Sequence, residues 1–180
     1  MSAKVSSFNT LRMNDYKYVF IVAGWNDYVT PITDELHKQL EPFGEDLGPK
    51  GLVVQPYKSA TRNTLDEVTG KNWDKDIADR FEQESHPFML IIDTDFEDFN
   101  PMSHPWSIIW FSEFENQPAK VIQLLKKLAN KTRTGKDVFS YLKCVTKESK
   151  LKTLAKYFEL KPKVFGISID AKAILEDLQC

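Results

Sequence analysis

The chain of 180 residues is long enough to bury a sizeable core and too short for two ordinary domains. Its hydrophobic content of 42%, with 12% aromatic residues, excludes a chain that is disordered throughout. The longest apolar runs, YVFIVAG and FMLII, are too short to cross a membrane, and the first residues lack the apolar core of a secretory signal. The two cysteines, Cys144 and Cys180, lie far apart and form no disulfide framework. We therefore expect a soluble cytoplasmic protein.

The charges are divided unevenly along the chain. Residues 1–116 carry 10 Lys and Arg against 20 Asp and Glu, residues 117–163 carry 13 against 3, and the last 17 residues add a net charge of −2. This division indicates an acidic protein partner, a surface for nucleic acid, or two halves of one fold that neutralise each other. We favour neutralisation and expect no nucleic acid binding at about 0.15 M salt, because the lysines lie between apolar residues on several faces.

Hydrophobic periodicity predicts alternating strands and helices. The first strand is dense in β-branched and aromatic residues, and Thr30 before Pro31 is a typical helix start. Residues 58–72 are polar and predict a loop with at most one helical turn. In chain order, the predicted strands are 16–24, 52–57, 88–92, 106–111 and 164–170, and the predicted helices are 31–40, 73–85, 118–130, 137–147, 150–159 and 171–178.

Strands that are apolar throughout, flanked by helices, are typical of parallel sheets that are covered on both faces. The predicted fold is therefore an α/β, three-layer Rossmann-like sandwich with a mainly parallel sheet and a helical, basic C-terminal half. Val19, Ile21, Leu90, Ile92 and Ile167 are expected to be buried in this sheet. The predicted organisation is a flexible lead-in (1–15) and a single domain (16–180), with an acidic body (16–116), a basic helical segment (117–163) and a final strand and helix (164–180).

This architecture predicts where a ligand binds. In open parallel sheets, ligands lie beyond the carboxyl ends of the strands. The segments GWNDYVT, QPYKSATRN and DTDFEDFNP follow the first three predicted strands, so we expect them to meet at one edge. The leading hypothesis is a module that binds a nucleotide or another phosphorylated small molecule there.

Asp93 and Asp95 directly follow the apolar run FMLII. Two carboxylates in this spacing at a strand end can coordinate Mg²⁺ or Mn²⁺, which prefer oxygen ligands and bridge to phosphates. The alternative is that Asp93 caps backbone amides and that the following acidic residues form a solvated turn before Pro101. We favour the ligand site for Asp93 and the cap for Asp95.

Five further residues are candidate ligand-binding groups. Asn26 and Asp27 can hydrogen-bond a ribose or base edge, or they can shape the turn before the first helix. Lys58, Ser59 and Arg62 can hold a phosphate after the second strand. Neither the glycine spacing of a dinucleotide fingerprint nor a glycine-rich loop ending in Lys-Ser/Thr is present.

Glu113 follows the mostly apolar run WSIIWF. It either emerges at the surface or lies in a pocket with a shifted pKa. The order of elements up to this glutamate resembles a TIR domain, in which a glutamate shortly after a tryptophan catalyses NAD⁺ glycohydrolysis. The resemblance implies that Glu113, after Trp110, is the catalytic residue, with one residue's difference from the usual interval.

The sequence IIDTD also resembles the metal-binding D-x-D motif of nucleotide-sugar glycosyltransferases, although little chain follows it to build an acceptor half. Two alternative functions therefore accompany the leading hypothesis. The first is an enzyme that cleaves a glycosidic bond of a nucleotide, with Glu113 or Asp93 in acid–base catalysis. The second is a non-catalytic interaction module whose basic helices bind an acidic protein.

Overall fold

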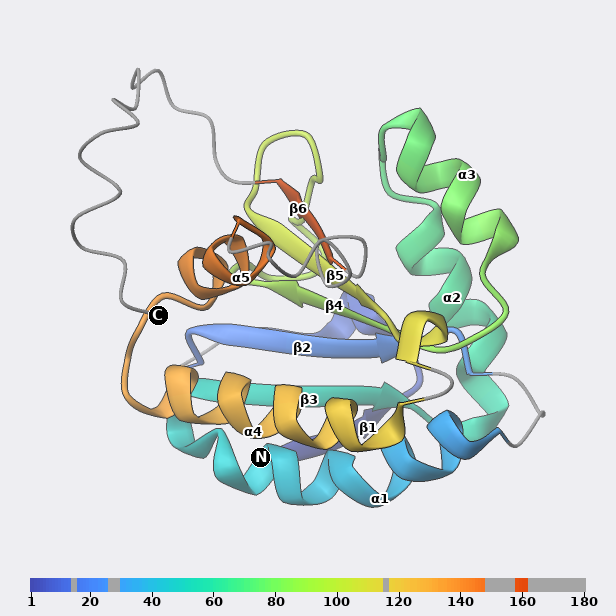
Figure 1. The fold of residues 1–180 in the computed structure, drawn as a ribbon. Coiled ribbons are helices and arrows are strands. Elements are labelled where there is room, and N and C mark those ends of the chain that lie inside the picture. The colour runs from blue at the N-terminus through green and yellow to red at the C-terminus, as the bar shows by residue number, and fades with distance from the viewer. Residues whose placement is uncertain (14–15, 26–29, 115–116, 148–157, 162–180) are drawn as a thin grey trace.

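The computed structural model describes residues 1–13, 16–25, 30–114, 117–147 and 158–161. Strands and helices alternate along most of these residues (Figure 1). The strands are β1 (Ser2–Val5), β2 (Tyr18–Ala23), β3 (Gly51–Pro56), β4 (Phe88–Ile92), β5 (Trp106–Trp110) and β6 (Phe158–Lys161). The α-helices are α1 (Pro31–Asp46), α2 (Thr61–Thr69), α3 (Lys75–Gln83), α4 (Pro118–Arg133) and α5 (Val138–Lys147). Four 3₁₀ helices are η1 (Phe8–Thr10), η2 (Gly48–Lys50), η3 (Lys58–Ala60) and η4 (Phe111–Phe114).

The strands form one mixed sheet in the order β1-β3-β2-β4-β5-β6. Strands β1, β3 and β2 are parallel, whereas β4 is antiparallel to both β2 and β5, and β6 is antiparallel to β5. The register pairs Ala23 with Phe88 and Val19 with Ile92, so β4 begins beside the end of β2. The prediction of a mainly parallel sheet is thus met only in the first half of the sheet.

The direction of β4 follows from a helix that the sequence patterns did not predict. Residues 58–72 were expected to be a loop, but they contain η3 and α2. Helix α2 carries the chain away from the end of β3 and α3 brings it back, so β4 starts at that same edge (Figure 1). Only Thr64 and Val68 of α2 are fully buried, and the Thr64 hydroxyl donates to Ala60 O at 2.8 Å. Two buried residues give too weak a periodic signal to predict a helix.

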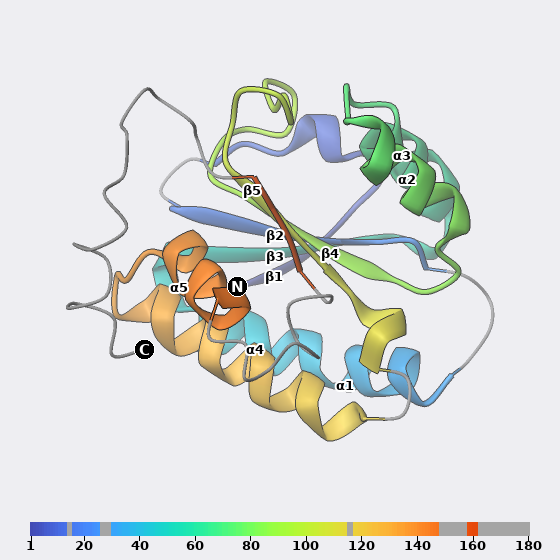
Figure 2. The same cartoon turned by 45° about the horizontal axis from the view of Figure 1, so that its top comes forward.

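Each face of the sheet packs against helices (Figure 2). Helices α1, α4 and α5 contribute to one hydrophobic cluster, and α2 and α3 contribute to the other. The predicted burial of Val19, Ile21, Leu90 and Ile92 is confirmed, with at most 2% of each residue exposed. Ile167, the strand 164–170 and the helix 171–178 lie outside the described residues. No described helix is both long and apolar enough to cross a membrane.

The predicted flexible lead-in is wrong for residues 1–13. Strand β1 pairs with β3, and the amides of Val53 and Tyr57 donate to Met1 O and Val5 O, each at 2.9 Å. Phe8 is fully buried at the start of η1. A short strand with few apolar residues shows little hydrophobic periodicity, so the sequence did not predict β1. Its strand conformation depends on pairing with β3.

Helix α1 extends beyond its predicted end at residue 40. It begins as predicted, with Thr30 as N-cap and Pro31 in the first turn, but it continues past Pro42 to Asp46. Phe43 is buried and its ring meets that of Phe20 edge-to-face at 5.2 Å. This packing outweighs the unfavourable position of the proline within the helix.

Helix α5 occupies the predicted range 137–147 almost completely. Its N-terminus is fixed by Asp137, whose carboxylate accepts from the Ser140 hydroxyl at 2.6 Å and the Phe139 amide at 3.1 Å. Tyr18 Oη, at the start of β2, donates to Asp137 at 3.0 Å and accepts from Val138 N at 3.3 Å. Of the predicted helix 150–159, only the last two residues are described, and they belong to β6.

Candidate functional site

The connecting segments leave the sheet at the two opposite ends of its strands, and the predicted site residues are divided between these two ends. We call the edge where β2, β3 and β5 end and β4 begins the pocket edge, and the edge where β4 ends and β5 begins the loop edge. Lys58, Ser59 and Arg62 lie at the pocket edge, whereas Asp93 and Asp95 lie at the loop edge. The expectation that all these groups meet is therefore wrong, because β4 runs in the opposite direction to β2 and β3.

The acidic loop 93–105 is bound to neighbouring segments by its own polar groups. Asp95 Oδ1 accepts from the amide of Met13 at 2.5 Å, and Glu97 forms an ion pair with Arg12 at 2.6 Å. Lys71 Nζ donates to Phe96 O at 2.7 Å and lies 4.6 Å from the centre of the Phe96 ring. These contacts fasten the loop to the N-terminal segment and to the residues that follow α2, so they have a structural role.

The metal prediction for Asp93 and Asp95 stays a prediction. In the part of the chain that the structure describes, no three His, Cys, Asp or Glu side chains gather closely enough to hold a metal ion. Asp95 already accepts a backbone hydrogen bond. Asp93 lies close enough to Tyr18 for its charge to act on that phenol: burial is the main cause of the raised pKa of Tyr18, and the charges of Asp137 and Asp93 add to it.

At the pocket edge, the segment after β3 exposes the predicted phosphate-binding residues. Lys58 and Ser59 are exposed in η3, and Arg62 is exposed in the first turn of α2. The N-cap residue Ala60 supplies no side-chain hydrogen bond to the helix. Asn26 and Asp27, the other predicted ligand-binding residues, lie outside the described residues.

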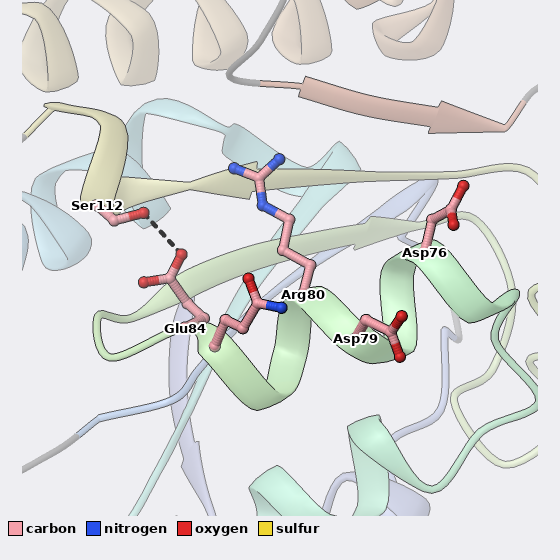
Figure 3. A pocket seen from close by; sticks show the side chains of 6 residues that line it. Asp76, Asp79, Arg80, Glu84 and Ser112 are labelled. Atoms are coloured by element: carbon pink, nitrogen blue, oxygen red, sulfur yellow. Dashed lines mark hydrogen bonds between the residues drawn. The ribbon is translucent and has the colours of Figure 1, made fainter.

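A pocket lies between α3 and η4, the 3₁₀ helix that follows the end of β5 (Figure 3). It is shallow and open to solvent, with a volume of about 390 Å³. Charged and polar side chains form its walls: Asp76, Asp79, Arg80, Gln83, Glu84 and Ser112. The first four are spaced three or four residues apart and so share one face of α3.

Arg80 lines the pocket and packs against an aromatic cluster. Its guanidinium carbon lies 4.5 Å from the centre of the Trp110 ring, which is fully buried. Phe81 and Phe88 pack against the same ring, with ring centres 5.3 and 5.4 Å from it. A guanidinium is flat and carries its N–H groups at its edge, so one that lies over an aromatic ring has the geometry to bind a carboxylate or phosphate with two hydrogen bonds.

Glu84 is fixed at the end of α3, and only 8% of its side chain is exposed. One carboxylate oxygen accepts from the Ser112 hydroxyl at 2.6 Å, and the other accepts from the amide of His86 at 2.9 Å (Figure 3). The same carboxylate lies 3.6 Å from His86 Nδ1. These bonds join the turn before β4 to the start of η4 and hold the pocket wall in one arrangement.

Glu113, the predicted catalytic residue, follows Ser112 in η4. Its backbone therefore lies next to the pocket wall, while the position of its side chain is outside the described part of the structure. The catalytic role of Glu113 therefore stays a prediction, as do both alternatives for its side chain, an exposed position and a pocket.

The sequence patterns did not single out Arg80 or Glu84. The signal that was available is the polar face of α3, where residues 76, 79, 80 and 83 recur at helical spacing opposite the apolar Ile77 and Phe81. That Trp110 lies beneath Arg80 depends on the antiparallel pairing of β4 with β5, which the sequence does not reveal.

The chain matches no protein-family model, no curated protein and no solved structure.

Proposed function

We propose that the protein binds a nucleotide or a phosphorylated sugar in the pocket between α3 and η4. The observation that carries this proposal is the guanidinium of Arg80, 4.5 Å from the centre of the buried Trp110 ring. Packing against the ring restricts the side chain before a ligand arrives, so less conformational entropy is lost when it binds a phosphate. The flat, always charged guanidinium suits the two-pronged recognition of phosphate oxygens.

The carboxylates of the pocket suit the sugar of such a ligand. Asp76 and Asp79 are exposed on α3 and line the pocket together with Arg80. Ionised carboxylates only accept hydrogen bonds, so they are partners for the hydroxyl groups of ribose rather than for a phosphate. A ligand with a phosphate at one end and free hydroxyls at the other matches both kinds of group.

Lys58, Ser59 and Arg62 supply a second contact for a longer ligand. They follow β3, which is three strand positions from β5, the strand that ends at the pocket. Adjacent strands are about 4.8 Å apart, so the two sites are separated by roughly 14 Å across the sheet. The phosphate of a mononucleotide in the pocket would contact Arg80 alone, whereas a dinucleotide is long enough for its phosphates to reach both Arg80 and the segment after β3.

The experiment is a thermal-shift screen followed by calorimetry with AMP, ADP, NAD⁺ and ribose 5-phosphate, each with and without MgCl₂. A ligand that binds only the folded state raises the melting temperature. We expect Arg80→Ala to abolish the shift, and Arg62→Ala, a matched loss of an arginine at the same edge, to change only the shift with NAD⁺. No shift with any of these ligands, or an equal shift in the wild type and Arg80→Ala, would refute the proposal.

A second candidate is cleavage of the glycosidic bond of the same ligand. The observation that favours it is that Glu113 directly follows Ser112, a residue of the pocket wall. In this reaction water replaces nicotinamide at the ribose carbon of NAD⁺ and gives ADP-ribose, nicotinamide and a proton. Chromatography of NAD⁺ incubated with the protein tests it: Glu113→Gln should abolish release of nicotinamide, and Glu115→Gln should not. A wild-type protein that binds NAD⁺ but leaves it intact would exclude the enzyme and keep the binding function.

A further inference from the structure

Helices α1 and α4 lie side by side on one face of the sheet and run in the same direction (Figure 1). Both begin near the pocket edge, because α1 follows the end of β2 and α4 follows the end of β5. Their inner faces are apolar and buried, so their outer faces together form one surface of the molecule (Figure 2). We call this surface the paired-helix face.

The two helices carry opposite charges. Helix α1 contains five carboxylates and one lysine, whereas α4 contains four lysines, one arginine and no acidic residue. The exposed charges are concentrated in the C-terminal halves of both helices, near the same end of the face. In these halves they are Glu41, Glu45 and Asp46 on α1 and Lys126, Lys127 and Arg133 on α4, while Asp34, Lys38 and Lys120 are exposed in the N-terminal halves.

These opposite charges are not joined to each other within the molecule. Among the described residues, no carboxylate of α1 lies within ion-pair distance of a cation of α4, and the one ion pair on this face, Lys38 with Asp34, is internal to α1. The paired-helix face therefore carries exposed acidic residues on α1 next to exposed basic residues on α4, and the charge of Glu45 also acts on the amino group of Met1.

We propose that the paired-helix face binds a second copy of this chain as a symmetric dimer. A two-fold axis that lies in the interface, parallel to the two helices and midway between them, places α1 of each copy over α4 of the other. Because such an axis keeps positions along the helices unchanged, the carboxylates of Glu41 and Glu45 meet Lys126 and Lys127 of the other copy. In this arrangement the acidic residues of each copy face the basic residues of the other copy.

The same charges argue against other partners. A nucleic acid or an anionic membrane attracted by α4 would be repelled by the carboxylates of α1 alongside it. Insertion into a membrane also requires exposed apolar side chains, and the large exposed hydrophobic residues of the described chain, Met1, Tyr57 and Met102, are on neither helix. A face with adjacent stripes of both signs is complementary to itself.

The association is expected to be weak and sensitive to salt. Exposed ion pairs contribute little individually, and salt screens them. Sedimentation velocity over a series of protein concentrations should show dimers at about 0.05 M NaCl, and the association constant should fall at least about tenfold at 0.5 M NaCl, where the screening length is roughly a third as long.

Charge reversal provides the decisive test. Lys126→Glu with Lys127→Glu, and separately Glu41→Lys with Glu45→Lys, should each make the chain monomeric, because the four reversed or facing positions then bring like charges together across the interface. Mixing these two variants should give a heterodimer tighter than the wild-type dimer, and combining all four substitutions in one chain should restore self-association. A control that keeps the net charge reverses two exposed charges of α3, Lys75→Glu and Glu82→Lys, and should leave the association unchanged.

Two results would overturn this proposal. One is a wild-type chain that is monomeric at every concentration at low salt, or a dimer that the α1 and α4 reversals leave intact. The other is a monomer that binds a DNA duplex and loses this binding in Lys126→Glu with Lys127→Glu, which would make the face a polyanion surface. Misfolding cannot imitate the expected outcome, because a heterodimer of two monomeric variants requires both to be folded.

Discussion

The loop edge and the pocket edge of the sheet are both rich in charged residues, yet they use them differently. At the loop edge, Asp95 and Glu97 bind Met13 N and Arg12, and Lys71 binds the backbone of the loop itself. At the pocket edge, Lys58 and Arg62 are exposed, and the charges of α3 line an open pocket. Charge density alone therefore does not locate a functional site, because the charges of the two edges differ in whether they border an open pocket.

Aromatic side chains also pack at the loop edge, and removing one of them should have the largest effect on the free energy of unfolding. Phe96 is 1% exposed, and its ring meets that of Phe8 at 5.7 Å. Phe96→Ala should lower the free energy of unfolding by about 3–5 kcal/mol, because it removes a large buried side chain and leaves a cavity. Urea denaturation measures this change. Met102→Ala, at an exposed position of the same loop, should change stability by less than about 0.5 kcal/mol, and equal effects of the two variants would contradict a structural loop.

Asp95 distinguishes the structural role from metal binding. Asp95→Ala removes the acceptor for Met13 N and should cost about 1–2 kcal/mol, whereas Asp95→Asn keeps an oxygen acceptor and should cost less. If Asp93 and Asp95 instead bind Mg²⁺, MgCl₂ will raise the melting temperature of the wild type and of neither variant. Thermal unfolding of the three proteins with and without MgCl₂ separates the two roles.

A second structural carboxylate, Asp137, gives a dependence on pH. Burial acts to raise its pKa, but hydrogen bonds from Ser140, Tyr18 and the Phe139 amide outweigh burial and hold the pKa below its ordinary value. A lowered pKa means that the ionised carboxylate stabilises the fold above the unfolded pKa of about 3.9, and that this stabilisation is lost as the pH falls through the folded pKa.

Asp137→Ala should therefore lower the free energy of unfolding at pH 7 by about 1–2 kcal/mol through loss of the α5 N-cap. The difference from the wild type should shrink below a pH of about 4, where the carboxyl group of the unfolded chain becomes protonated, until the pH falls through the lower folded pKa. Denaturation curves at several pH values measure it. Asp137→Asn, which keeps a capping oxygen, is the control, and a difference independent of pH would show that the charge of Asp137 does not matter.

The contrast between the edges also separates what the sequence could predict from what it could not. The central strands were predicted because their runs of β-branched and aromatic residues are buried on both faces, and α1 and α4 were predicted because their apolar stripes are long. Helix α2 buries only two residues completely and gave no such signal. Its omission reversed the inferred direction of β4 and placed Asp93 at the wrong edge.

The pocket was harder to predict than the fold for a related reason. Lys58, Ser59 and Arg62 follow β3 directly, so their edge could be inferred from the chain order. Arg80 and Trp110 are thirty positions apart in the sequence, and their contact exists only because α3 packs over β5. Contacts of this kind depend on strand order and helix placement, and local patterns carry no information about either.

Substitution of Arg80 should have the smallest effect on the free energy of unfolding among these variants. It tests whether the charges at the pocket edge serve a ligand rather than the fold. If the pocket edge holds its charges for a ligand, removing the guanidinium from Trp110 should cost no more than about 1 kcal/mol, the usual contribution of a partly exposed cation–π contact. Arg80→Lys keeps the positive charge but loses the flat fork, so it should be nearly neutral in urea denaturation and still bind phosphate ligands less tightly than the wild type. A loss above about 2 kcal/mol in Arg80→Ala would mean that Arg80 is a structural residue like Asp95. The two edges would then not differ in the way that their exposed charges indicate.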